Sequence, residues 1–63
     1  MTEADQVHLS ERTRALAQNI VDLSFLVGAD NIKAVTYTAE DLRGKAQRLL
    51  DLAEHLLREE QKS

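Results

Sequence analysis

The residues whose spacing best suits chemistry are Asp51, His55 and Glu59, which recur at every fourth position. On an α-helix this spacing places all three side chains on one side, where an imidazole and two carboxylates could ligate a divalent metal ion. A helix rich in charged residues more often carries such a series as solvated surface. The Glu-x-x-His pairs of di-iron helical bundles do not occur, because Glu54 and His55 are adjacent. We therefore expect no metal site and no cofactor.

Nucleophilic catalysis needs a hydroxyl or thiol beside a base, together with donors for an oxyanion. The sequence has no cysteine and only two glycines, so it offers neither a reactive thiol nor the glycine-rich turn of a nucleophile elbow. The paired carboxylates Glu40–Asp41 and Glu59–Glu60 fall at expected helix ends, where the helix dipole and solvent account for them. These features predict that the protein is not an enzyme.

The charge balance argues against nucleic acid and membrane surfaces as partners. The formal net charge is −3, and Arg43, Lys45, Arg48 and Arg58 point in different directions around one predicted helix. No continuous basic stripe can follow a phosphate backbone or an acidic bilayer. An RNA-binding dimer of helical hairpins, of the Rop architectural type, is the alternative function. That likeness is one of size and shape, since no stretch of the sequence matches that family.

The distribution of apolar residues also bears on location. The longest apolar runs are far shorter than the roughly 20 residues that span a bilayer, and the beginning of the chain lacks a basic segment followed by an apolar one. We therefore expect a soluble, cytoplasmic protein.

The composition of the 63 residues predicts an all-α fold, because it includes ten leucines and eight alanines but no proline. The first helix is expected over about residues 5–27, because a stripe with helical spacing ends there. Its members are Leu9, Thr13, Leu16, Ile20, Leu23 and Val27. Thr2 with Asp5, or else Ser10, is expected to cap its start. Gly28 is expected to end it in a left-handed conformation.

The second helix is expected over about residues 39–60. Thr38 is the predicted N-cap, and Tyr37 and Leu42 stand at the positions of a hydrophobic staple. Leucines and alanines then form a wide apolar face, which favours a helix that touches two neighbours in a bundle. Asp41 and Lys45 form a favourable pair one turn apart. The connection, residues 28–38, is expected to contain either a short helical turn capped by Asp30 or an extended segment.

Together these elements predict a single domain, residues 1–63, that folds as an antiparallel helical hairpin. Two helices cannot enclose a complete interior, and the stretch from Ile20 to Val27 is apolar nearly all round. A homodimer closing into a four-helix bundle is the simplest solution. The residues expected to support self-association are Leu16, Ile20, Val21, Leu23, Phe25, Leu26, Leu49, Leu50, Leu52, Leu56 and Leu57.

One residue of the second helix breaks its local pattern. Gly44 lies inside the predicted helix, where glycine is less favourable than alanine by about 1 kcal/mol. Drift on an exposed face is one interpretation. The other is a surface for a larger protein, formed by Gly44 with Arg43 and Arg48. The functional prediction is a small protein–protein interaction or regulatory module, similar to an adaptor or inhibitor, whose first partner is a second copy of itself.

Overall fold

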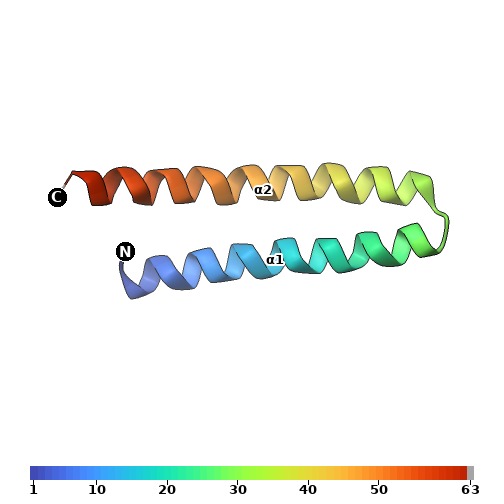
Figure 1. Cartoon of the computed structure of the whole chain (residues 1–63), viewed down its shortest axis with the longest axis horizontal. Helices are drawn as coiled ribbons and strands as arrows, with labels where there is room; N and C mark the ends of the chain where they lie inside the picture. Colours follow the sequence, from blue (N-terminus) through green and yellow to red (C-terminus); the bar gives the residue numbers. More distant parts are fainter. Residues whose placement is uncertain (63) are drawn as a thin grey trace.

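A computed structural model describes residues 1–62 as two α-helices that lie side by side and run in opposite directions (Figure 1). Helix α1 spans Glu3–Gly28 and helix α2 spans Ile32–Gln61. The predicted all-α antiparallel hairpin is therefore confirmed. The Cα atoms extend over 50 × 17 × 10 Å, so the molecule is a single layer of two helices. Within residues 1–62, no helix combines the length and the apolar character that crossing a lipid bilayer requires.

Helix α1 begins at the earlier of the two predicted caps. The Thr2 hydroxyl accepts a hydrogen bond from the Asp5 N–H at 3.1 Å, and the Asp5 carboxylate accepts one from the Thr2 N–H at 3.0 Å. This reciprocal capping box pairs two of the backbone donors that a helix start leaves free. Ser10 lies within the helix.

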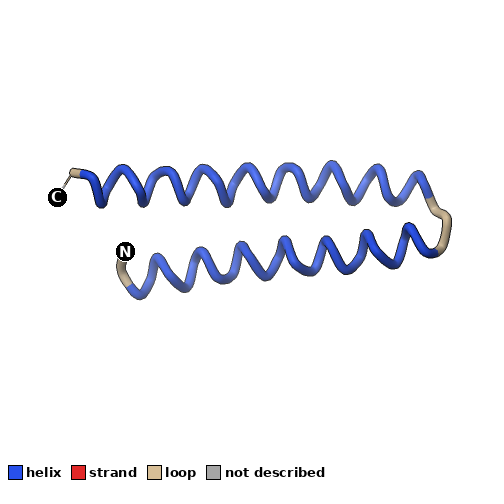
Figure 2. The backbone as a smooth tube through the Cα atoms, in the orientation of Figure 1, coloured by secondary structure: helices blue, strands red, loops and turns tan. Residues whose placement is uncertain are grey.

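The connection between the helices is much shorter than predicted (Figure 2). Residues 29–31 link α1 to α2, so the prediction of a connection over 28–38 and a helix beginning near 39 is wrong. Asn31 caps α2 in place of Thr38, because its side-chain oxygen accepts the Ala34 N–H at 3.2 Å. The β-branched residues that suggested an extended path are helical; the Thr36 hydroxyl donates to the Ile32 carbonyl at 2.9 Å. Val35 is partly buried, whereas Ile32 and Thr36 are exposed, and β-branching lowers helix propensity only slightly.

The left-handed residue at the turn is Asp30, with φ at 54°, and not Gly28 as predicted. The N–H of Asn31 donates to the Leu26 carbonyl and the N–H of Asp30 to the Val27 carbonyl, both at 3.1 Å. This is the Schellman pattern, in which the residue just past the helix takes the left-handed conformation. Because α1 includes Gly28, the left-handed position falls two residues after it, at Asp30. Aspartate is among the residues that tolerate positive φ.

The two helices meet along a heptad seam. Its members are buried or partly buried and are spaced three or four residues apart, except that seven residues separate Leu9 from Leu16, because Arg12 is exposed. This is the pattern of helices that wrap around each other in a left-handed supercoil. From α1 the seam takes Leu9, Leu16, Asn19, Leu23 and Leu26. From α2 it takes Val35, Thr38, Leu42, Lys45, Leu49, Leu52 and Leu56. Among residues 1–62 no hydrophobic side chain is fully buried, because a single layer covers each one from one side only.

Candidate interaction surface

A polar network interrupts the leucine seam near the middle of α1. Asn19 is 6% exposed, and its amide nitrogen donates to the Asp41 carboxylate at 3.0 Å. The Lys45 ammonium donates to the Asn19 amide oxygen at 2.9 Å and lies 3.0 Å from the Asp41 carboxylate. All three groups are therefore mutually paired. A polar residue at a seam position disfavours other alignments of the helices, because sliding would bury its amide without partners.

The network also changes the acidity of Asp41. Hydrogen bonds from the Asn19 amide and the Lys45 ammonium stabilise the carboxylate, with a further contribution from the Lys45 charge. These interactions lower the pKa of Asp41 below its ordinary value. The predicted pairing of Asp41 with Lys45 one turn later is thus confirmed.

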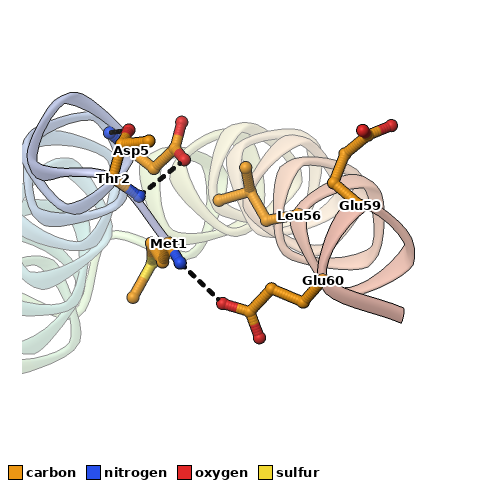
Figure 3. Close-up of a pocket in the computed structure, with 6 residues that line it drawn as sticks. All are labelled: Met1, Thr2, Asp5, Leu56, Glu59 and Glu60. Carbon is orange, nitrogen blue, oxygen red and sulfur yellow. Dashed lines mark hydrogen bonds and ion pairs between the residues drawn. The ribbon is translucent and has the colours of Figure 1, made fainter. Parts of the chain in front are cut away.

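At the end of the hairpin away from the turn, the first residue of the chain contacts α2 (Figure 3). The Met1 ammonium donates to the Glu60 carboxylate at 2.8 Å, and this contact raises the pKa of the ammonium. The backbone hydrogen bond from Thr2 lowers the pKa of Asp5 beside it. These residues, with Leu56 and Glu59, line a shallow recess. The ends of the hairpin are thereby held together by a charge pair that is open to solvent on one side.

The seam divides the surface of the layer into two broad faces. With the seam at heptad positions a and d, positions b and e of two antiparallel helices lie on one side, and positions c and g on the other. The b and e side is called the apolar face. On α1 it comprises Glu3, Gln6, Ser10, Thr13, Ala17, Ile20, Ser24 and Val27. On α2 it comprises Thr36, Ala39, Arg43, Ala46, Leu50, Ala53, Leu57 and Glu60.

The other side is called the polar face, because ionised side chains are spread along it. Those side chains are Glu11, Asp22, Asp41, Arg48, Asp51 and Arg58. The apolar face carries three ionised side chains, Glu3 and Glu60 at the end away from the turn and Arg43, against the six named for the polar face, so the two faces differ in charge.

The structure distributes the residues predicted for self-association over four places. Six are partly buried in the seam within one chain: Leu16, Leu23, Leu26, Leu49, Leu52 and Leu56. Ile20, Leu50 and Leu57 lie on the apolar face and are at least half exposed. Val21 points away from the seam at the outer edge of α1, and Phe25, 79% exposed, belongs to the polar face. Large apolar side chains are therefore displayed on more than one side.

The seam on α1 differs from the predicted apolar stripe at some positions, where the residue one earlier in the chain takes the place of the predicted one. Ile20 and Val27 are 58% and 64% exposed, whereas Asn19 and Leu26 occupy the seam. Asn19 follows Leu16 by three residues and precedes Leu23 by four. This heptad spacing indicates a seam position for Asn19, whereas hydrophobicity alone favours Ile20. Sequence reasoning missed the polar network for this reason.

The remaining predicted sites do not converge. Arg43 lies on the apolar face, and Gly44 and Arg48 lie on the polar face. A Cβ added at Gly44 would meet nothing within 4 Å, so no other segment of the hairpin requires a glycine there.

Asp51 and His55 are exposed on the polar face, and Glu59 lies at the end of the seam. Within the described residues, no group of three such side chains is placed to hold a metal ion. The hairpin's surfaces, and not a pocket, are thus its candidate functional features. No protein-family model, curated protein or solved structure matches the chain.

Proposed function

We propose that this chain is a small, cytoplasmic, non-enzymatic module for protein–protein interaction or regulation, and that it acts as a homodimer in which two hairpins close into a four-helix bundle. The observation that carries the proposal is the lack of a closed interior. Among residues 1–62 no hydrophobic side chain is fully buried, and several large ones are at least half exposed. They include Ile20, Val21, Phe25, Leu50 and Leu57.

The dimensions of the hairpin support an incomplete domain. Its accessible surface is 5103 Å², whereas a compact monomer of 7.1 kDa exposes about 4,100 Å². Its Cα radius of gyration is 14.8 Å, against about 10.6 Å for a compact domain of this length. The excess surface is that of a layer with two open sides. A chain of this size without cysteines gains most from covering those sides with another chain.

A regulatory role needs a surface that remains free once two copies associate. The stretch of α2 around Gly44 is open, and Arg48 lies one turn later on the same polar face, whereas Arg43 lies on the apolar face. A larger protein could approach the helix backbone closely at Gly44, while the Arg48 guanidinium orients an acidic partner.

Sedimentation equilibrium over a series of protein concentrations tests the assembly. We expect a species of about twice 7.1 kDa that dissociates on dilution with a parallel loss of helical circular dichroism. A fully helical particle of 7.1 kDa at every concentration would contradict the proposal.

A further inference from the structure

Granting the proposed dimer, we infer that the second copy docks on the apolar face, so that the apolar faces of two hairpins pack against each other and the polar faces point outward. This inference rests on the proposed function. It adds which of the exposed apolar side chains the dimer buries. The charge and the shape of the apolar face lead to it, and the area of the layer shows that one face is sufficient.

The first property is charge. Burial of the polar face would remove several ionised side chains from water, including Asp22, Arg48 and Asp51, and a buried charge without a partner is strongly unfavourable. Along most of its length the apolar face carries one such group, Arg43. The long Arg43 side chain can extend to the rim of the interface and keep its guanidinium hydrated. Glu3 and Glu60 lie at the end of this face away from the turn, and Glu60 is already paired with the Met1 ammonium at 2.8 Å. The Thr13 hydroxyl already donates to the Leu9 carbonyl at 2.7 Å, so burying Thr13 leaves no unpaired donor.

The second property is area. The layer measures 50 Å by 17 Å between its Cα atoms, so each broad face covers about 850 Å². Two such faces in contact bury about 1,700 Å², which is the size of a standard stable protein–protein interface. A single apolar face on each copy is therefore sufficient for a dimer.

The third property is shape. On α1, the large residues Ile20 and Val27 lie toward the turn, and small residues such as Ala17 lie toward the other end. On α2 the arrangement relative to the turn is the opposite. Ala39 and Ala46 lie nearer the turn, with Arg43 between them, and Leu50 and Leu57 lie farther from it. A two-fold axis in the plane between two such faces, whether along the helices or across them, sets large residues against small ones. Such interdigitation is what close helix packing requires.

Val21 and Phe25 lie outside this face, although their exposure made them candidates for the same contact. Leu50→Asp and Phe25→Asp therefore form a matched pair, since each introduces one carboxylate at a position that is 50% or more exposed in the hairpin. We expect Leu50→Asp to weaken dimerisation about a hundredfold or more, and Phe25→Asp to change the dissociation constant less than about threefold. Sedimentation measures both constants.

Thiol labelling gives a second readout that does not depend on a disruptive variant. The chain has no cysteine, so Ala46→Cys on the apolar face and Ala15→Cys on the polar face each introduce a single thiol. Both positions are exposed in the isolated hairpin. In the dimer we expect a maleimide to modify the thiol at position 46 at least about tenfold more slowly than the thiol at position 15, because only the former lies between the copies.

The outcomes separate the two proposals. Equal labelling of both thiols in a sample that sediments as a dimer, or dissociation by Phe25→Asp and not by Leu50→Asp, would overturn the inference and leave the dimer standing. A chain that stays monomeric and helical would overturn the proposed function itself.

Discussion

Substitutions of Asn19 test how the buried polar network contributes to the fold. Its two hydrogen bonds are each worth about 1 kcal/mol net, so Asn19→Ala should destabilise the hairpin by about 2 kcal/mol. Asn19→Leu loses the same bonds but buries an apolar side chain beside the seam leucines, which returns about 2 kcal/mol. Asp41 and Lys45 remain 3.0 Å apart with side chains 59% and 35% exposed, so water can replace the lost amide. We expect the leucine variant to lie within about 1 kcal/mol of the wild type.

Thermal unfolding followed by circular dichroism measures both effects. All variants are compared at one protein concentration, because the stability of an associating chain depends on it. For a domain this small, 2 kcal/mol corresponds to a melting-temperature difference of about 8–16 °C. A leucine variant as unstable as the alanine variant would refute the reasoning, since it would show that burial cannot substitute for the amide.

The same pair of variants separates stability from specificity. With leucine at position 19 the seam loses its buried polar residue near the centre of α1. Alternative alignments of the helices then come closer in free energy to the native one. We expect the amide spectrum of Asn19→Leu to contain additional or broadened resonances despite its retained stability. A single sharp set of resonances would show that other contacts already define the alignment.

Four further predictions follow from local features. Asp5 and Asp41 have pKa values lowered from 3.8, so they stabilise the fold above that pH and lose this contribution as the pH falls through their folded-state values; Asp41→Asn should flatten part of this acid dependence in melting curves. Thr2→Ala should lower stability by about 1 kcal/mol in urea unfolding, because it removes the hydroxyl of the capping box. Asp30→Val should destabilise by roughly 1–2 kcal/mol and Asp30→Gly should not, because the position has positive φ. Titration with duplex or loop RNA at low salt should show no tight complex; a strong, salt-sensitive one would favour the alternative function.

Much of the fold was predictable from local chemistry. The helices and their antiparallel arrangement are present in the structure as predicted, and of the two predicted caps of α1 the structure has the capping box of Thr2 and Asp5. The start of α2 was not, because Thr38 before Glu40 and Asp41 resembles an N-cap as closely as Asn31 does. The choice between the two caps depends on contacts of Val35 and Thr38 with the other helix, which no local pattern contains.

The sequence by itself determined that two amphipathic helices would form, because helix propensity, capping and apolar periodicity act over a few neighbouring residues. Only the tertiary structure decided which of two stripes, one residue apart, would form the seam. Asn19 entered it and Ile20 did not, because Asp41 and Lys45 of α2 supply the partners that make a buried amide favourable. That choice leaves Ile20, Leu50 and Leu57 exposed together beside the seam. The apolar face is thus a consequence of how the two helices pair, and neither helix alone contains it.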